Sequence, residues 1–322
     1  MSASELQVSI VIVCMNNLKN LYPCLNSIRK YTSVSYETFV VAYLFSKENL
    51  EKVKLDFPWV TFIESNEIRG FSENNNLALR QAKGKYCFVL NDDTFFEQDV
   101  LGRLVDCFNN VEDDNAAIIS PVLLNRDRTI QVCGRPPFKA KEYVLSLLHL
   151  WSEKDNGGKY INQKGVFRTY NIIGAAFLGR TDILRKFNYF DEYYYFCPED
   201  IALSTKLNNA GYHCYVDSNA KLVHLGGGSG NKNVSKIKMA TMPAGEKGSL
   251  RFFSGGNVFK QITLGLFVTT LALLKSAYYK VKSKKAMDSN DIIARANWNV
   301  VCSLLTSKTP KQIFCKYYSS VK

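Results

Sequence analysis

The stretch Tyr-Cys-Phe-Val-Leu-Asn-Asp-Asp-Thr, residues 86–94, is an apolar run that ends in two adjacent carboxylates. A short apolar run bounded by polar residues is typical of a strand buried inside a sheet. Parallel sheets bind their ligands at the carboxyl ends of the strands. We therefore expect a buried strand over residues 86–90, with Asp92 and Asp93 at a ligand site just beyond its end.

On both sides of this stretch the sequence alternates between strand-like and helix-like segments. Apolar runs predict strands at residues 8–13, 38–44, 60–64, 86–90 and 117–123. Helical apolar spacing predicts helices at residues 18–30, 49–57, 74–82 and 99–108. Because β-α alternation with short connections builds a parallel sheet, we predict an α/β fold with a mostly parallel central sheet and flanking helices.

The alternation is interrupted at residues 124–170, which contain Gly134, Pro136, Pro137 and a polar stretch. This segment predicts a hairpin and an excursion over the site. The pattern then resumes with a strand at 171–179, a helix at 199–210 and short strands at 213–216 and 221–224.

The last part of the chain differs in composition. Residues 226–247 are rich in Gly, Ser and Lys and predict a flexible segment, with a linker at 231–250. Residues 261–274 are an uncharged run of fourteen, shorter than the ~20 apolar residues of a spanning helix. They predict an interfacial membrane helix or a core helix packed on the α/β domain.

The positive charge is concentrated in this C-terminal segment. Residues 251–322 hold twelve Lys and Arg against two Asp, which accounts for +10 of the net charge of +12. A general nucleic-acid binder would carry its charge on the globular part, so we expect no nucleic-acid partner. The cluster Lys280, Lys282, Lys284 and Lys285 favours contact with an anionic membrane surface, or else forms a solvated face of a packed helix.

The nine cysteines include no CxxC pair, which argues against a disulfide framework and against a zinc ribbon. Residues 1–7 hold no basic residue before the short apolar run 8–13, unlike a signal peptide. We therefore expect a cytoplasmic location, with the basic segment on the cytoplasmic face of the cell membrane.

Three constellations carry chemistry. Asp92 and Asp93 suit Mg²⁺ or Mn²⁺, which prefer oxygen ligands, although a turn that caps the next helix would also use them. Glu199 and Asp200 suit a general base, although acids in a first helical turn also complement the helix dipole. His224, before a glycine-rich stretch at 226–230, suits a metal ligand or an ordinary core histidine.

The order of these stretches resembles the inverting GT-A glycosyltransferases of family 2, in their rhamnosyltransferase-like branch. The resemblance runs from about residue 8 to residue 229 and rests on eight stretches, at residues 9–16, 69–76, 90–94, 174–178, 190–192, 198–200, 210–212 and 223–224. It implies a nucleotide-diphospho-sugar transferase fold over residues 1–230. The nucleotide-binding half would be about 1–123 and the acceptor half about 124–230, with a basic helical segment at 251–322.

The resemblance also implies roles for individual residues. Asp93 would hold the divalent metal, Mg²⁺ or Mn²⁺, with His224 completing the metal site. Asp200 would be the catalytic base, with Glu199 beside it. Asp92 would lie near the donor ribose. The other donor-binding positions would be Cys14, Asn16, Gly70, Asn75, Gly174 and Ala175.

These roles together imply a metal-dependent enzyme that moves a sugar from a nucleotide diphosphate to a hydroxyl. The acceptor would be a saccharide or a lipid-linked saccharide in cell-surface polysaccharide synthesis. Two positions depart from the family pattern: Ala42 stands where an acid usually reads the nucleotide base, and Ala202 where a second acid usually follows Asp200. A non-catalytic member that binds a nucleotide sugar or a protein partner is the alternative.

Overall fold

The computed structural model describes residues 6–132, 134–152, 160, 162–226 and 235–319. The chain divides into two compact units. Unit 1 consists of Met1–Ile68, Glu73–Phe190 and Asp200–Gly227, and unit 2 consists of Arg69–Ser72, Asp191–Glu199 and Gly228–Lys322.

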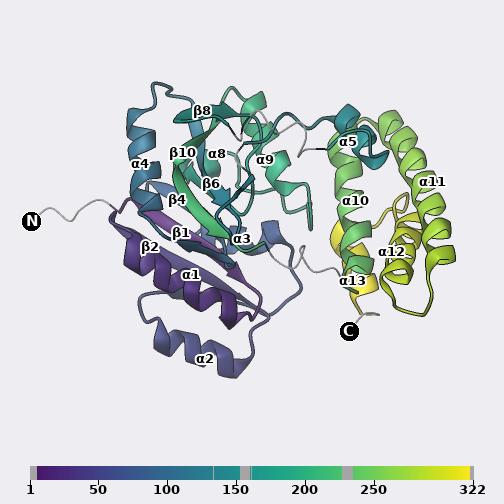
Figure 1. Cartoon of the computed structure of the whole chain (residues 1–322), viewed down its shortest axis with the longest axis horizontal. Helices are drawn as coiled ribbons and strands as arrows, with labels where there is room; N and C mark the ends of the chain where they lie inside the picture. Colours follow the sequence, from purple (N-terminus) through teal and green to yellow (C-terminus); the bar gives the residue numbers. More distant parts are fainter. Residues whose placement is uncertain (1–5, 133, 153–159, 161, 227–234, 320–322) are drawn as a thin grey trace, which may run out of the picture. The chain divides into compact units, whose positions relative to one another are not determined.

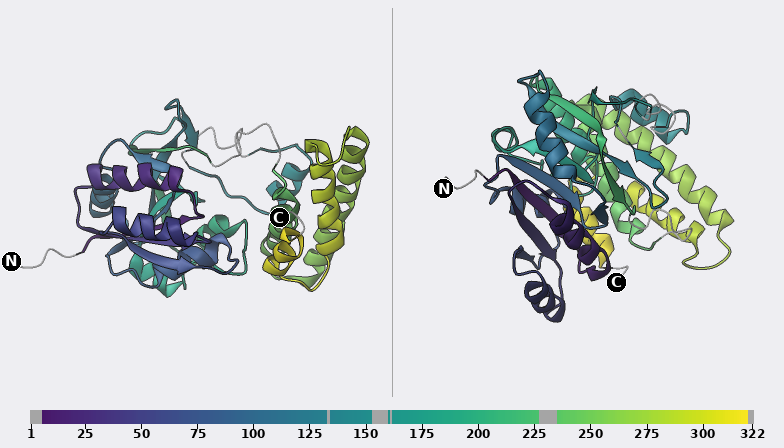
Figure 2. Two further views of the ribbon diagram at one scale, coloured as in Figure 1. Left: turned by 90° about the horizontal axis from the view of Figure 1, so that it is seen from below. Right: turned by 60° about the vertical axis from the view of Figure 1, so that its left-hand side comes forward.

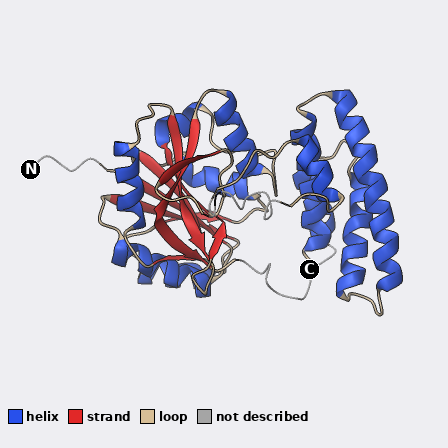
Figure 3. Ribbon diagram, turned by 45° about the horizontal axis from the view of Figure 1, so that its top comes forward, coloured by secondary structure: helices blue, strands red, loops and turns tan. Residues whose placement is uncertain are grey.

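Unit 1 is built on one sheet, drawn in red in Figure 3. Its strands are β1 (Val8–Cys14), β2 (Tyr36–Tyr43), β3 (Thr61–Ser65), β4 (Tyr86–Asn91), β5 (Thr94–Phe96), β6 (Ala116–Leu124), β7 (Ile130–Val132), β8 (Val166–Thr169), β9 (Ala176–Arg180) and β10 (His213–His224). The strand order is β3-β2-β1-β4-β9-β6-β10-β5, with β7 on β6 and β8 on β10. β3, β2, β1 and β4 are parallel, and β6 is parallel to β10. β9 is antiparallel to both of its neighbours.

Helices flank this sheet, as Figure 1 shows. They are α1 (Leu18–Tyr31), α2 (Lys47–Asp56), α3 (Phe71–Leu79), α4 (Val100–Asn110), α8 (Thr181–Lys186) and α9 (Glu199–Asn209). A further helix, α5 (Ala140–Leu147), also belongs to unit 1. The core forms where their apolar faces meet the sheet: Leu21 and Leu25 of α1 and Leu104 of α4 are buried together with Ile10 and Phe88. The predicted α/β fold with a mostly parallel central sheet is therefore confirmed.

Most of the predicted elements are present, and the differences lie at irregular places. The strand expected over 171–179 begins only at Ala176, because Asn171 forms an isolated bridge with Arg135 and residues 174–175 form a turn. The two short strands expected at 213–216 and 221–224 are one strand, β10, with a register shift between Asp217 and Lys221. β5, β8 and α5 were not expected from the sequence.

The described part of unit 2 consists of helices without strands: α10 (Lys238–Ser254), α11 (Val258–Lys282), α12 (Ser289–Ser303) and α13 (Pro310–Tyr318). α11 and α12 lie side by side in both views of Figure 2. They are antiparallel, because Ser276 Oγ donates to the carbonyl of Ala294 and Lys280 Nζ to Asp291. The sequence prediction of a helical C-terminal segment is confirmed.

The prediction of a flexible linker over residues 231–250 is wrong for residues 238–250, because these residues belong to α10. Lys247 explains part of this difference. Its side chain is buried, and its ammonium donates to the carbonyls of Leu304 (2.8 Å) and Thr306 (2.5 Å) just beyond the end of α12. A lysine at a helix C-terminus satisfies carbonyls that have no partner inside the helix.

Asp291 joins the two long helices of unit 2. Its side chain is fully buried and accepts from Lys280 Nζ (2.7 Å), Arg295 Nε (2.7 Å) and the amide of Met287 (2.9 Å). The Lys280 bond is the largest cause that holds the pKa of Asp291 well below its usual value. A buried carboxylate with these three donors fixes the turn between α11 and α12.

We expect Asp291→Asn to lower the free energy of unfolding by about 2–3 kcal/mol at pH 7, because both cationic partners lose their counter-charge. A carboxyl with a depressed native pKa stabilises above its unfolded pKa, so the difference from wild type should shrink below about pH 4. Urea unfolding followed by circular dichroism measures both quantities. The exposed Asp106→Asn should change stability by less than about 0.5 kcal/mol, and an equal loss there would contradict this assignment.

Candidate functional site

The predicted carboxylates lie where β4 ends. Asn91 is the last residue of β4, and Thr94 begins β5, which pairs antiparallel with the end of β10. In that pairing Thr94 lies opposite His224, and the amide of Leu225 donates to the carbonyl of Asp93 (2.9 Å). The backbone therefore brings Asp93 and His224 to the same place although 131 positions in the chain separate them.

The side chains of these two residues meet. Oδ1 of Asp93 lies 3.3 Å from Nε2 of His224, and both side chains are largely buried. The other ring nitrogen of His224, Nδ1, lies 2.7 Å from Oε1 of Gln131. The arrangement is a carboxylate, an imidazole and an amide in one line.

The neighbours of Gln131 decide which nitrogen of His224 carries the proton. Thr129 donates its hydroxyl hydrogen to the Asp127 carboxylate, so its oxygen is left to accept from Asn125 Nδ2 (3.0 Å). Asn125 Oδ1 then accepts from Gln131 Nε2 (3.2 Å). The Gln131 oxygen therefore faces His224 as an acceptor, and Nδ1 carries the hydrogen. In the neutral ring, Nε2 presents a lone pair to Asp93.

Two acceptors that face each other at this distance suit a cation. Two ligand atoms each about 2.1 Å from one ion lie about 3 Å apart when their angle is near 90°. A hydrogen bond from the second nitrogen to an amide oxygen is the usual orienting contact of a metal-binding histidine. Within the described residues no group of three or more His, Cys, Asp and Glu is arranged around a common point. Asp93 and His224 thus provide two protein ligands, and a ligand oxygen would have to supply others.

Asp92 points away from this pair, toward β1. Its carboxylate accepts a hydrogen bond from the thiol of Cys14, the last residue of β1. Burial raises the pKa of Asp92 to about 6; the bond from Cys14 opposes this rise and the charge of Asp93 adds to it. Burial also raises the pKa of the Cys14 thiol, and the negative charge of Asp92 adds to the rise. Cys14 is therefore a neutral donor that orients Asp92.

Gly174, Ala175 and Asp200 adjoin the same strand end. The carbonyl of Ala175 accepts from the amide of Asn91 (2.9 Å), and the amide of Gly174 donates to Oδ2 of Asp200 (3.3 Å). Asp200 is the second residue of α9, and its Oδ1 accepts from the amide of Ile201 (2.7 Å). The structure therefore brings Asp200 next to the segment that touches β4.

Arg135 is the cationic partner of Asp200. Its Nη1 donates to Oδ2 of Asp200 (2.8 Å) and to the carbonyl of Ile172 (3.1 Å), and both charged side chains are mostly buried. The backbone of Arg135 is held as well, because its amide donates to Thr169 Oγ1 (2.8 Å). These contacts fix the orientation of the Asp200 carboxylate.

The remaining predicted positions are placed as follows. Asn16 has a positive φ of 52° after β1, and its Oδ1 accepts from Asn49 Nδ2 (2.9 Å). Asn75 is buried inside α3. Gly70 and Glu199 belong to unit 2, where a Cβ at Gly70 would lie 2.4 Å from the Tyr195 carbonyl oxygen, so a glycine is required there. Residues 227–230 of the glycine-rich stretch lie outside the described residues.

Ala42, at the position where a base-reading acid was expected, is buried near the end of β2. It pairs with Cys14 on one side and with Glu64 on the other. Glu64 is an acid on the neighbouring strand, and its carboxylate lies 3.1 Å from Lys54 Nζ. The structure therefore places a methyl group in register with Cys14 and an ion-paired acid one strand further along the sheet.

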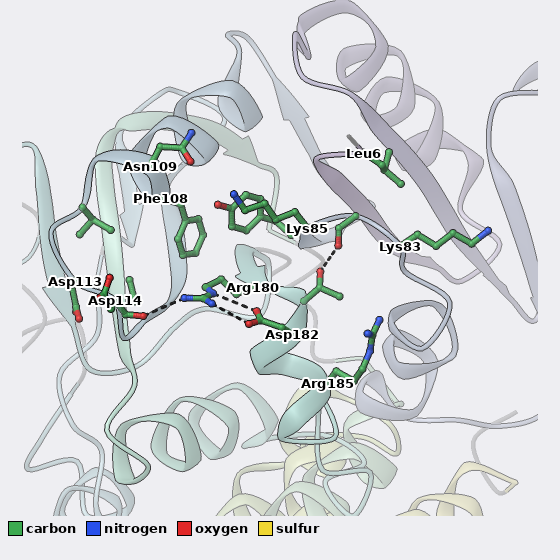
Figure 4. A pocket seen from close by; sticks show the side chains of 15 residues that line it. Leu6, Lys83, Lys85, Phe108, Asn109, Asp113, Asp114, Arg180, Asp182 and Arg185 are labelled. Atoms are coloured by element: carbon green, nitrogen blue, oxygen red, sulfur yellow. Dashed lines mark hydrogen bonds and ion pairs between the residues drawn. The ribbon is translucent and has the colours of Figure 1, made fainter. Parts of the chain in front are cut away.

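A cavity of about 660 Å³ lies at the amino ends of β4 and β6, and Figure 4 shows the side chains that line it. It is lined near the beginnings of β4 and β6, and Arg180 there is bound to Asp182 (3.0 Å) and to the carbonyl of Asp114 (3.2 Å). None of the predicted site residues lines it. The polar groups at the carboxyl end of β4 therefore form a separate site.

Sequence reasoning missed Arg135 and Gln131. Both lie in the segment 124–170, where no apolar periodicity marks an element. The only feature of the sequence that could have pointed to Arg135 was its position, between Gly134 and Pro136 in a connection expected to cover the site. Their partners could be found only from the pairing of β10 with its neighbours and the course of the chain before β9.

Solved structures share this fold at low sequence identity. GalNAc-T7, solved with UDP, GalNAc and Mn²⁺, matches 69% of this chain and 44% of its own, with 16% identity and a TM-score of 0.54. The mannosyltransferase PcManGT from Pyrobaculum calidifontis, solved with GDP-Man and Mn²⁺, matches 98% of this chain and 80% of its own, with 13% identity and a TM-score of 0.50. The chain thus spans less than half of GalNAc-T7. The likeness shows a GT-A fold.

A search of curated protein sequences returned no match. The sequence profile of the family described as "Glycosyl transferase family 2" matches residues 9–187. That range contains β1 to β9 and both aspartates after β4. Since it covers more than half of the 322 residues, the chain belongs to glycosyltransferase family 2.

Proposed function

We propose that this chain transfers a sugar from a nucleoside diphosphate donor to a hydroxyl group, with inversion at the anomeric carbon and with a divalent metal. The observation that carries the proposal is the pair Asp93 and His224, whose Oδ1 and Nε2 atoms lie 3.3 Å apart while Gln131 contacts Nδ1. The acceptor is a saccharide or a lipid-linked saccharide of a cell-surface polysaccharide. The rhamnosyltransferase-like branch and a cytoplasmic location belong to the same proposal.

Asp93 and His224 would hold Mg²⁺ or Mn²⁺. When bound, the cation would neutralise the charge that develops on the diphosphate as the sugar leaves. Mg²⁺ in particular is often held by one or two carboxylates together with substrate phosphates, which agrees with a site of only two protein ligands. The two solved relatives were each obtained with Mn²⁺ and a nucleotide or nucleotide sugar, which supports a divalent metal here.

Asp200 would be the general base, with Glu199 beside it. An inverting transfer needs one carboxylate that takes the proton of the acceptor hydroxyl as its oxygen attacks. Oδ2 of Asp200 is occupied by Arg135 and Gly174, and Oδ1 accepts only the amide of Ile201 among its described contacts. Oδ1 therefore has a further lone pair for the acceptor hydroxyl, while Arg135 holds the carboxylate in place.

The donor would occupy the ends of β1 and β4. Asp92, oriented by Cys14, would accept from the ribose, and Asn16, Asn75, Gly174 and Ala175 of unit 1 would line the pocket. Ala42 offers the nucleotide base no carboxylate. Recognition of the base would then rest on neutral polar groups, such as Asn16 and Asn49, which are bound to each other near the end of β1.

We expect Asp93→Asn and Asp200→Asn to fail in different ways. Asp93→Asn should lose metal-dependent donor binding, because it removes a charged ligand. Asp200→Asn should keep donor binding and lower kcat by about a hundredfold or more, because it removes the proton acceptor. Calorimetric titration of the nucleotide with Mn²⁺, together with a transfer assay, separates the two losses.

The exposed Asp106→Asn is the matched control and should leave both properties unchanged. An Asp200→Asn protein that transfers sugar at the wild-type rate would show that another group is the base. If the wild-type chain bound a nucleotide sugar but transferred it to no acceptor, the non-catalytic alternative would replace this proposal.

Gln131 supplies a second test that needs no turnover. We expect Gln131→Leu to weaken Mn²⁺ binding about tenfold in the presence of a nucleoside diphosphate, because Nδ1 of His224 loses its acceptor. Paramagnetic resonance of free Mn²⁺ measures the affinity directly.

Gln131→Glu is the control for this test, because a carboxylate still accepts from Nδ1. Its Mn²⁺ affinity should stay within about threefold of wild type or rise. Equal losses in the two variants would show that Gln131 supports the fold and not the histidine.

A further inference from the structure

The solvent-facing side of α11 is apolar. We define the apolar stripe as Phe259, Ile262, Leu266, Leu273, Leu274 and Val281, which recur at spacings that place them on one helix face. Their exposed fractions run from 46% for Leu273 to 88% for Val281. No charged residue occurs between Lys260 and Lys275. A helix on a water-exposed surface normally presents charged residues on this side.

The opposite face of α11 packs within unit 2 through small residues. Gly265, Val268 and Ala272 are the buried positions. A Cβ at Gly265 would lie 2.5 Å from the Leu305 side chain, so this close approach needs glycine. The larger apolar side chains of α11 therefore point outward and the small ones inward, the reverse of a soluble amphipathic helix.

The exposed threonine hydroxyls on this side of α11 are bonded within the helix. The hydroxyl of Thr263 donates to the carbonyls of Phe259 and Lys260, and that of Thr270 to the carbonyl of Leu266 (2.9 Å). Backbone groups within α11 are bonded by the helix itself. The stripe can therefore leave water without stranding a hydrogen-bonding group, which is the condition for entering a lipid phase.

We propose that the apolar stripe docks α11 in the plane of an anionic lipid bilayer. Apolar side chains on one face with lysines beside them are the pattern of helices that lie in the interface. Lys282, Lys284 and Lys285 are exposed at the end of α11 and supply the charge that anionic headgroups attract. Trp298 of α12 and Leu305, just beyond the end of α12, are half exposed.

A transmembrane orientation is disfavoured by the packing, although α11 is the one helix in the described ranges long and apolar enough to span. Its 25 residues would extend about 37 Å. α12 runs antiparallel beside it and carries Asp291, Arg295 and Asn297. Carrying these groups into hydrocarbon would cost several kcal/mol each, whereas an in-plane helix keeps α12 on the water side.

A second copy of the chain is a poorer occupant of this face. Residues 251–322 carry +10, so two such segments brought face to face repel each other, whereas anionic lipid neutralises them. This docking rests on the proposed function in one respect. A lipid-linked acceptor would be presented at the membrane surface on which α11 lies.

The test is binding of the full chain to vesicles of phosphatidylcholine with and without phosphatidylglycerol, measured by flotation without donor or acceptor. Wild type should bind the anionic vesicles, and less at high salt. Leu266→Gln with Leu274→Gln should lower the partition coefficient at least about tenfold. Lys282→Gln with Lys284→Gln and Lys285→Gln should lower it about tenfold to a hundredfold. Lys280 is left unchanged because it binds Asp291.

Leu55→Gln, at a residue of α2 that is 80% exposed, is the matched control and should leave vesicle binding unchanged. Circular dichroism should give one helix content for all variants. Wild-type-level binding by the Leu266 and Leu274 double variant would overturn the proposal, and so would an equal loss in Leu55→Gln. A dimer that this double variant dissociates, with no vesicle binding by wild type, would identify a second copy as the occupant. Because no turnover is measured, a catalytically inactive chain can still pass.

Discussion

The antiparallel pairing of β5 with β10 is the constraint on which the candidate site depends. It sets His224 opposite Thr94 and joins Leu225 to Asp93 through the backbone. The Asp93 carboxylate and the His224 imidazole therefore meet. Gln131 of β7, a strand that pairs with β6, then fixes the ring by accepting from Nδ1. The metal-binding chemistry proposed here follows from this one register.

The second half of the site is assembled around β9. The hydrogen bond from the amide of Asn91 to the carbonyl of Ala175 attaches the segment before β9 to the end of β4. The amide of Gly174, in the same segment, donates to the carboxylate of Asp200 and so holds Asp200 near that strand end. Arg135 then closes the arrangement from the other side. Each proposed catalytic group is thus held by backbone contacts as well as by side chains, which is what a preorganised site requires.

Much of unit 1 could be predicted from the sequence, because short apolar runs bounded by polar residues, such as 8–13 and 86–90, favour buried strands. The aspartates after β4 were found for the same reason. The ion pair of Arg135 with Asp200 could not be found, since it depends on an aperiodic connection. The helix over residues 238–250 was missed because its Gly and Lys content suggests a loop. In the structure Lys247 is buried instead, and its ammonium donates to the carbonyl of Leu304, just beyond the end of α12. The length of α11 was underestimated because the uncharged run of the sequence ends before Lys275. The helix continues through Lys275 and Lys280 to Lys282.

The docking of α11 is tested separately, whereas the proposed catalytic role requires a chain that binds a nucleotide sugar through a cation. The most direct measurement is thermal unfolding with a panel of nucleoside diphosphates and their sugars, each with and without Mn²⁺. A ligand at about 100 times its Kd should stabilise the chain by about 2.7 kcal/mol. We predict stabilisation by one nucleotide class, only with Mn²⁺, and its loss in Asp93→Asn. Equal stabilisation with and without the metal, or none with any nucleotide, would contradict the account.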